Sequence, residues 1–390
     1  MAPPAKPVTR PDNPNFSSGP CAKYPGWQSR ALDYALLGRS HRSLEGRARL
    51  KDLIDRTRRL IELPDDYLLA IVPGSDTGAF ELALWSMLGA RGTDVLAWEN
   101  FGHVWVTDIV GQLKLKDVRV LGAEFGELPD LRQVDFDRDV VFTANGTTSG
   151  VRIPNYDWIA KDRRGLTLVD ATSAILAQPV DWSKTDVLTF SWQKVLGGEA
   201  AHGMLALSPR AVERLESYVP PWPLPKLFRI VKDGRVDRAI FEGETINTPS
   251  MLCVEDCLNA LSWAESIGGQ SALHARADRN AKVLFDWVAR TPWVKNLARE
   301  LATWSNTSVC LSFCDPAVKA LSLEGQVQFA RNVAQSLATE RAAFDVASYR
   351  GVPPGLRIWT GATVEAVDIQ AVLPWIEWAF LSEKERLDSP

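Results

Sequence analysis

The sequence has no long apolar run, only 4 histidines and no large excess of either charge. It contains no stretch of about 18 apolar residues, and residues 1–20 lack the apolar core of a signal peptide. We therefore expect a cytoplasmic protein without a membrane partner. The 44 Lys and Arg against 48 Asp and Glu give a net charge of -4, so we also expect no nucleic-acid partner. Any site for an anion must be local.

Motifs that would identify several other kinds of site are missing. The chain has neither the Gly-Lys-Ser/Thr ending of a Walker loop nor a G-x-G-x-x-G dinucleotide motif. Its 5 cysteines, an odd number, favour free thiols over a disulfide framework. The pairs Cys253 and Cys257, and Cys310 and Cys314, share a spacing, but no histidines complete a zinc ligand set. We therefore predict no metal and interpret these cysteines as small buried residues.

What is present is the pattern of a large α/β protein. A chain of 390 residues with 46% hydrophobic residues can bury a sizeable core. Strand-like runs such as YLLAIVPG, DVLAWEN, DVVFTAN, LTLVDAT and DVLTFSW alternate with helical segments. This alternation predicts a mostly parallel sheet covered by helices, with ligands at the carboxyl ends of the strands. We expect an N-terminal arm at 1–30, a large domain at 31–270 and a small α+β domain at 271–390.

Three of the predicted strand ends carry side chains suited to chemistry. PGSDTGAF leads from a strand into a helix, where Ser75, Asp76 and the helix-start amides could form a phosphate cup or simply cap the helix. Asp170 ends the strand LTLVDAT, and Lys194 follows the next strand. The two could be a plain ion pair. With a phosphate cup nearby, Lys194 could instead bind pyridoxal phosphate covalently, with Asp170 on the ring nitrogen.

Each residue type suits that second interpretation. An amine must be neutral to attack an aldehyde, so confinement near positive charge would lower the pKa of Lys194 and raise its reactivity. An ionised Asp170 would keep the ring nitrogen protonated, and the ring would then accept electrons released at the substrate α-carbon. Lys194, once freed, could carry the proton between that carbon and the cofactor.

Five segments together resemble one family: FSSGPC, GRSHRS, VDATSA, TFSWQKVLGGEAAHG and ETINTPS. Over nearly its whole length the chain is similar to phosphoserine aminotransferases, which are class V, fold type I pyridoxal phosphate enzymes. The resemblance implies an α/β fold with a mostly parallel seven-stranded sheet in a large domain and a smaller C-terminal α+β domain. It also implies amino-group transfer from L-glutamate to 3-phosphohydroxypyruvate, giving O-phospho-L-serine and 2-oxoglutarate in L-serine biosynthesis.

The resemblance implies a set of residues around pyridoxal 5'-phosphate. The catalytic pair would be Lys194 and Asp170. The cofactor-binding residues would be Ser75, Asp76, Trp105, Thr147, Asp170, Gln193, Lys194, Asn247 and Thr248. Trp105 would stack on the ring, with His103 as the alternative, or could be a core residue. Thr147 would bond the 3-hydroxyl region or act as a turn residue, and Gln193 would contact the phosphate.

The resemblance further implies a homodimer with shared active sites, because Asn247 and Thr248 match a pair that reaches the phosphate from the other subunit. They could also cap the helix that follows. The substrate-binding residues implied are His41, Arg42, Arg350 and Arg357. Arg357 would hold the α-carboxylate with its planar fork, and the others would meet the substrate phosphate or side-chain carboxylate.

This sequence departs from the family pattern at two of these places. Asp76 stands where many members have arginine, and Tyr349 stands where they have histidine. Two other functions stay open at this stage. Another class V aminotransferase, acting on glyoxylate, alanine or serine, would need no substrate role for His41 and Arg42. A non-catalytic binding protein on the same fold would tolerate the loss of Lys194.

Overall fold

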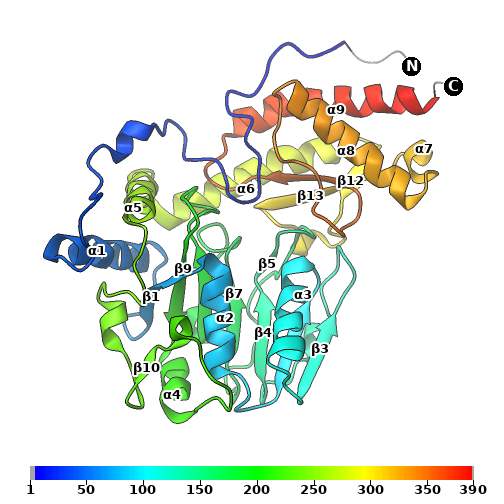
Figure 1. Cartoon of the computed structure of the whole chain (residues 1–390). Helices are drawn as coiled ribbons and strands as arrows, with labels where there is room; N and C mark the ends of the chain where they lie inside the picture. The colour runs from blue at the N-terminus through cyan, green and yellow to red at the C-terminus, as the bar shows by residue number, and fades with distance from the viewer. Residues whose placement is uncertain (1–4, 389–390) are drawn as a thin grey trace.

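A seven-stranded sheet forms the centre of the large domain, at the bottom of Figure 1. The computed structural model describes residues 5–388. The strands run in the order β1-β9-β8-β7-β4-β2-β3. Only β9 is antiparallel to its neighbours, so the predicted α/β class with a mostly parallel seven-stranded sheet is confirmed. The strands are β1 (Leu68–Pro73), β2 (Thr93–Ala97), β3 (Val118–Gly122), β4 (Asp139–Thr143), β7 (Thr167–Asp170), β8 (Val187–Ser191) and β9 (His202–Leu207).

The sheet is buried on both faces, which is why its central strands are continuous apolar runs. Alternate residues of β1 pack in two separate hydrophobic cores, one on each face of the sheet. Leu69 and Ile71 pack with the side of the sheet that holds α1 (Leu44–Leu60) and α5 (Met251–Ser266), and Ala70 and Val72 pack with the opposite side. On that opposite side lie α2 (Ser75–Met87), α3 (Asn100–Val106) and α4 (Pro209–Ser217).

The small domain is an antiparallel three-stranded sheet with four helices, at the upper right of Figure 1. Its elements are α6 (Gly269–Val288), β12 (Val294–Asn296), β13 (Ser308–Phe313), α7 (Pro316–Lys319), α8 (Leu323–Thr339), β14 (Gly355–Trp359) and α9 (Ala366–Asp388). Two-residue ribbons complete the chain: β5 (Asn145–Gly146) with β6 (Val151–Arg152), and β10 (Val231–Lys232) with β11 (Arg235–Val236). The domain limits 31–270 and 271–390 remain a prediction.

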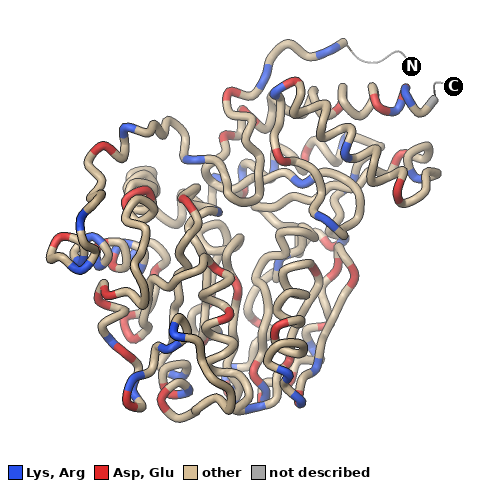
Figure 2. The backbone as a smooth tube through the Cα atoms, viewed as in Figure 1, with Lys and Arg blue, Asp and Glu red and all other residues tan. Residues whose placement is uncertain are grey.

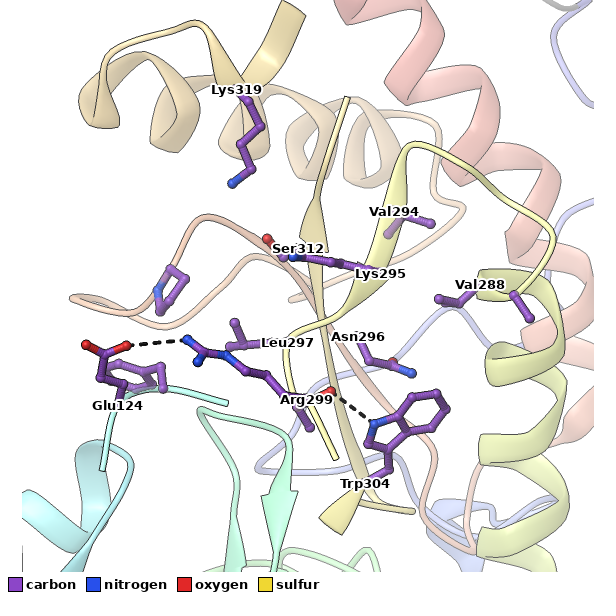
Figure 3. Close-up of a pocket in the computed structure, with 14 residues that line it drawn as sticks. Glu124, Val288, Val294, Lys295, Asn296, Leu297, Arg299, Trp304, Ser312 and Lys319 are labelled. Carbon is purple, nitrogen blue, oxygen red and sulfur yellow. Dashed lines mark hydrogen bonds and ion pairs between the residues drawn. The ribbon is translucent and has the colours of Figure 1, made fainter. Parts of the chain in front are cut away.

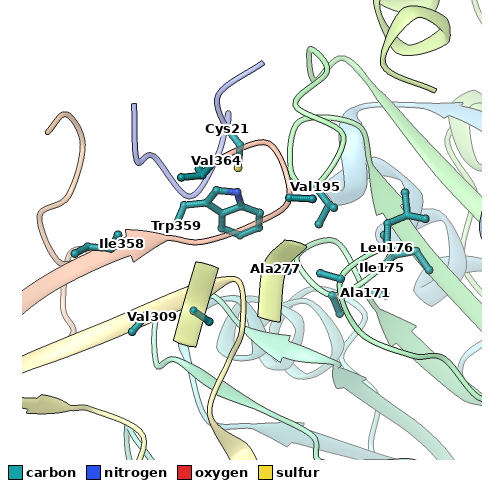
Figure 4. Close-up of a cluster of buried hydrophobic side chains, with 14 of the residues drawn as sticks. Cys21, Ala171, Ile175, Leu176, Val195, Ala277, Val309, Ile358, Trp359 and Val364 are labelled. Atoms are coloured by element: carbon teal, nitrogen blue, oxygen red, sulfur yellow. The ribbon is translucent and has the colours of Figure 1, made fainter. Parts of the chain in front are cut away.

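The N-terminal segment runs over the small domain before it reaches the large one. The backbone N–H of Trp359 donates to the carbonyl of Phe16 (3.1 Å), and that of Cys21 donates to the carbonyl of Gln193 (2.8 Å). Figure 4 shows Cys21 beside Trp359 of β14, in one apolar cluster with Val195 from the loop after β8. The segment therefore joins the two domains at the loop that carries Lys194.

The described surface has no dominant charge or membrane-spanning element. Figure 2 shows Lys and Arg interspersed with Asp and Glu along both domains. Within residues 5–388, no helix has the length and apolar composition that a membrane crossing requires.

Candidate active site

Lys194 and Asp170 lie at the carboxyl ends of adjacent parallel strands. β7 ends at Asp170, which is in register with Thr189 of β8, and Lys194 follows β8 after a short loop. The Lys194 amine donates to the carbonyl of Ser18 in the N-terminal segment. Asp170, Asp76 and Arg357 are all near enough for their charges to act on the lysine pKa. The fold thus brings together residues that are far apart in the sequence.

Two glycines allow the N-terminal segment to lie directly on the lysine. Gly197 has a φ of +63°, which favours glycine, and a Cβ there would lie 2.3 Å from the carbonyl oxygen of Ala22. A Cβ at Gly19 would lie 2.3 Å from Nζ of Lys194. Larger residues at either position would therefore push this segment away from the site.

The surroundings of Lys194 favour its neutral form. Burial lowers the pKa of its amine, and the positive charge of Arg357 lowers it further, whereas Cys21, Asp170 and Asp76 act in the opposite direction. Burial also raises the pKa of the Cys21 thiol to about 12, so this neighbour is a neutral thiol. A neutral amine is what attack on a carbonyl carbon requires.

Asp170 is held by two donors from different elements. Its Oδ1 accepts from the backbone N–H of Thr172 (3.0 Å), and its Oδ2 accepts from Nε1 of Trp105 on α3 (3.2 Å). Trp105 is buried against Phe80, with ring centroids 4.7 Å apart. The indole therefore meets the carboxylate through its edge, which is a different role from the stacking predicted for it. The alternative stacking residue, His103, is exposed.

Sequence reasoning missed Phe101, the aromatic residue at the start of α3. Its ring centroid lies 5.8 Å from that of Tyr349, and the guanidinium carbon of Arg357 lies 5.5 Å from the Tyr349 ring. Phe101 thus lies in a chain of contacts that leads to Arg357, whereas Trp105 lies behind Asp170. The signal in the sequence was its place directly after the strand-like run DVLAWEN, where the other site residues also stand.

The start of α2 offers amides that could hold an anion. Gly74 and Ser75 both donate their backbone N–H to the carbonyl of Ala201, at 3.1 and 3.3 Å. The amides of Asp76 and Thr77 come next, and helix geometry gives them no acceptor inside the helix. The side chain of Asp76 does not lie in this cup. It is buried, and its polar neighbours include Asp170.

A second buried carboxylate, Glu99, connects α3 to the loop after β4. It accepts from the backbone N–H of Gly102 (2.8 Å) and from the hydroxyl of Thr148 (2.8 Å). Burial raises the pKa of Glu99 to about 7. In the same loop the hydroxyl of Thr147 donates to the hydroxyl of Ser173, three residues after Asp170 (2.8 Å). Glu99 was not predicted, and only its burial distinguishes it from a surface glutamate.

The predicted substrate arginines differ in their surroundings. Arg357 lies on β14, and its Nε is buried without a hydrogen-bond partner among the described residues. Arg350 is exposed, and its backbone carbonyl accepts from the side chain of Asn100 (2.9 Å). Arg42, Asn247 and Thr248 are also exposed. Within one chain the fold therefore joins Arg357 to the site and leaves these other residues facing outward.

Comparison with known proteins decides the family. The chain is 56% identical over 377 residues to the phosphoserine aminotransferase of Methanosarcina barkeri, covering 96% of this chain and 99% of the relative. This chain belongs to the phosphoserine aminotransferase family. The resemblance predicted from the sequence is thereby confirmed. No protein-family model matches the chain.

Solved structures place the fold of this phosphoserine aminotransferase family member among related aminotransferases. A pyridoxal phosphate-bound phosphoserine aminotransferase from Trichomonas vaginalis gives a TM-score of 0.76 at 18% identity, covering 94% of this chain and 99% of that one. A pyridoxamine-pyruvate aminotransferase from Mesorhizobium loti gives 0.77 at 19% identity, covering 99% and 94%. The fold therefore does not separate substrates, and the family assignment depends on the closer sequence relationship.

The site has unpartnered polar atoms that fit the cofactor of phosphoserine aminotransferases. Among the described residues, side-chain atoms of five residues that follow or belong to β7, β8 and β14 are buried and have no hydrogen-bond partner: Thr172 Oγ1, Thr189 Oγ1, Ser191 Oγ, Gln193 Oε1 and Arg357 Nε. Buried polar groups in native proteins are nearly always paired. A polar group the size of a phosphorylated pyridine ring would supply such partners.

A pocket elsewhere on the molecule lies apart from these residues. Its volume is about 820 Å³, and its lining includes Glu124 and Phe125 of the large domain. Figure 3 shows it around β12 of the small domain, with Glu124 at one side. Arg299 pairs with Glu124 at its edge, and Asn296 and Trp304 lie in its wall. It contains none of the residues predicted for the phosphoserine aminotransferase site.

Proposed function

We propose that this protein uses pyridoxal phosphate to transfer an amino group between L-glutamate and 3-phosphohydroxypyruvate, giving O-phospho-L-serine and 2-oxoglutarate in L-serine biosynthesis. The observation that carries the proposal is the 56% identity, over nearly the full length of both chains, to a protein named phosphoserine aminotransferase. The adjacent strand ends with Lys194 and Asp170 give this family assignment a chemical basis.

We assign the residues that hold the cofactor as follows. Lys194 would form the covalent link, and Asp170 would accept the ring N–H. The amides at the start of α2 and Gln193 would bind the phosphate, because a helix N-terminus favours an anion. Thr147 would contact the ring hydroxyl. For the aromatic stacked on the ring we assign Phe101, since the N–H of Trp105 is directed at Asp170.

The chain's own residues then account for the proton transfers. Bound pyridoxal phosphate supplies a ring that withdraws electrons from the substrate α-carbon. Asp170, fixed by Thr172 and Trp105, would hold a proton on the ring nitrogen. Lys194 would remove and return the proton at the substrate α-carbon, and the depressed pKa of its amine suits it to act as a base. The N-terminal segment over Lys194 excludes water from this step.

We assign substrate recognition to cations from two regions. Arg357 binds the α-carboxylate, since its guanidinium has a free buried Nε and a fork that matches a carboxylate. His41 and Arg42 bind the phosphate or the glutamate side chain. Arg39 and Arg47 lie nearby in the chain, and burial, followed by the charges of Arg42 and Arg47, lowers the pKa of His41. The arginines would therefore supply the positive charge for a phosphate at neutral pH. Arg350 is assigned as a further phosphate contact.

A homodimer is part of the proposal, because His41, Arg42, Asn247 and Thr248 would act in the site of the other subunit. The segment that carries His41 also exposes large apolar side chains: Tyr34 is 98% exposed and Leu44 is 88% exposed. Figure 1 shows this segment running outside α5 to α1. Such surface is typical of a contact with another chain. We also propose a cytoplasmic location, which the five free cysteines support.

The test is the visible absorption of the purified protein with pyridoxal phosphate. We expect a band from the lysine-linked cofactor, which O-phosphoserine discharges and which alanine and serine leave in place. Lys194→Ala should keep the fold and bind the cofactor without this band. Discharge by alanine or serine alone would favour another class V aminotransferase, and a wild type without any band would contradict the mechanism.

A further inference from the structure

Asp76 is a buried carboxyl group for which the mechanism has no role so far. It lies in the first turn of α2 and is only 6% exposed. Burial and the charge of Asp170 act most strongly on its pKa, and the buried amine of Lys194 is also nearby. Its Oδ1 is buried without a hydrogen-bond partner among the described residues, and the same holds for the hydroxyls of Thr172 and Thr189.

The side chain of Asp76 lies beside Asp170. Thr189 is the register partner of Asp170 on β8, and Thr172 follows Asp170 by two residues. These two hydroxyls and the Asp170 carboxylate are the polar groups that act on Asp76. An acidic side chain on α2 therefore lies next to the carboxylate that serves the cofactor ring.

Two ionised carboxyl groups so close together in a buried site would repel each other strongly. Burial raises the pKa of Asp76 well above its usual range, and the charge of Asp170 raises it further, while the nearby hydroxyls of Thr189 and Thr172 oppose the shift only in part. Asp170 already accepts two N–H donors, which stabilise its charged form. The proton shared by the pair therefore belongs on Asp76, as in carboxyl dyads that hold one proton between two groups.

We propose that Asp76 is a positioning residue that stays protonated and donates a hydrogen bond to Asp170, so that the pair carries one negative charge towards the cofactor ring. The inference rests on the proposed function, because it concerns the carboxylate assigned to the ring nitrogen. Asp170 then has three donors, from Thr172, Trp105 and Asp76. A third donor stabilises the ionised form of Asp170 and fixes its orientation, so that the carboxylate is ready to accept the ring N–H.

The groups that face the pair come from several elements. Asp170 is on β7 and Glu99 precedes α3, and the negative charge of Asp170 acts on the pKa of both Asp76 and Glu99. Lys194 follows β8, and both carboxyl groups of the pair are near enough to act on its pKa. Arg357 acts on Lys194 from β14. Any measurement on Asp76 must therefore be separated from Glu99, another buried carboxyl group near Asp170.

Infrared spectroscopy can detect the proton directly in the protein without cofactor. Protein labelled with carbon-13 in its aspartate carboxyl groups should show, at pH 7, a carboxylic-acid carbonyl band that moves with the label. Labelling only aspartate excludes Glu99. Asp76→Asn should remove this band, whereas Glu99→Gln should keep it. If Asp76→Asn removes only carboxylate bands, or if the labelled wild type shows no acid band, Asp76 is ionised and the proposal is wrong.

Cofactor affinity shows whether Asp76 acts as a hydrogen-bond donor or only fills space. The asparagine amide in Asp76→Asn can still donate to Asp170, whereas Asp76→Ala cannot. We expect the dissociation constant of pyridoxal phosphate for the protein without cofactor to rise about tenfold in Asp76→Ala and clearly less in Asp76→Asn, since a hydrogen bond to a charged group is lost only in the first. Equal affinities in these two variants would overturn the proposal. A wild type that does not bind pyridoxal phosphate would instead overturn the proposed function, and the infrared result would still decide the protonation of Asp76.

Discussion

Nε1 of Trp105 lies 3.2 Å from Oδ2 of Asp170, and this contact fixes one side of the carboxylate. The backbone N–H of Thr172 fixes the other side at 3.0 Å. The carboxylate is thus oriented by the protein itself, so binding of the ring need not order it. Because the carboxylate is already oriented, no free energy is needed to reorganise it towards the ring during the reaction.

Trp105→Phe tests this orientation, because it keeps an aromatic ring and removes the N–H donor. We expect kcat/KM to fall about tenfold, in line with the loss of about 1.5 kcal/mol for a hydrogen bond to a charged group. The pH profile of kcat should also change. Trp182→Phe is the matched control, since it removes an indole donor to the carbonyl of Ile61 far from the site. Equal losses of activity in both variants would mean that the Trp105 contact is only structural.

Arg357→Lys tests the carboxylate site. A lysine keeps the charge but lacks the planar fork, so we expect KM for O-phosphoserine and for glutamate to rise about tenfold, with a smaller change in kcat. Steady-state kinetics with both substrates provide the measurement. Arg290→Lys, an exposed arginine on the same domain, is the control. An unchanged KM for both substrates would remove Arg357 from the binding site.

The shared active site can be tested by mixing two inactive variants. Lys194→Ala lacks the lysine in its own site, and a double variant with Asn247→Ala and Thr248→Ala lacks the groups proposed to serve its partner. After subunit exchange, half of the dimers combine one of each chain and hold one complete site, so we expect activity to recover to about a quarter of wild type. The Lys194→Ala variant alone, taken through the same exchange procedure, is the control. No recovery, despite a demonstrated exchange of subunits, would place these residues in the site of their own chain.

Glu99 should make the stability of the protein depend on pH. Its pKa is raised from 4.5 to about 7 by burial, so the native state holds a proton that the unfolded chain releases, and stability falls as the pH rises through this range. Glu99→Gln removes this loss of stability, because glutamine does not titrate. The difference between the free energy of unfolding of the variant and that of wild type should therefore increase, in favour of the variant, by up to about 3 kcal/mol from pH 5 to pH 8.

Urea unfolding of the protein without cofactor at these two pH values provides the measurement for Glu99. Glu324→Gln, on the exposed side of α8, should give the same difference from wild type at both. A Glu99→Gln variant that behaves in the same way as this control would show that Glu99 is ionised throughout the range.

The sequence predicted the sheet and the lysine because those signals are local. Buried parallel strands are continuous apolar runs, and a polar residue at the end of such a run stands out, as Asp170 and Lys194 do. The family resemblance supplied the activity. The same rule, that site residues stand at the ends of strand-like runs, also applies to the half-buried Phe101. It directly follows the run that ends at Asn100, so it could have been predicted as a site residue.

What the sequence could not supply were contacts between elements distant in the chain. Trp105 is one of 15 tryptophans, and only the packing of α3 against the sheet directs its N–H at Asp170. Asp76 looked like a helix cap or part of a phosphate cup, and the position of α2 over β7 and β8 turns it to Asp170 instead. Glu99 is unremarkable in the sequence, since burial alone changes its chemistry.

The N-terminal segment has a consequence for how the chain is made. Its partners come from elements more than 300 residues later in the chain: Thr9 accepts from Trp375, Arg10 bonds the carbonyl of Glu340, and Phe16 accepts from Trp359. A nascent chain can form the large sheet first, since domains fold as units during synthesis. Residues 9–16 must wait for β14 and α9, so the segment can settle over Lys194 only after both domains have been synthesised.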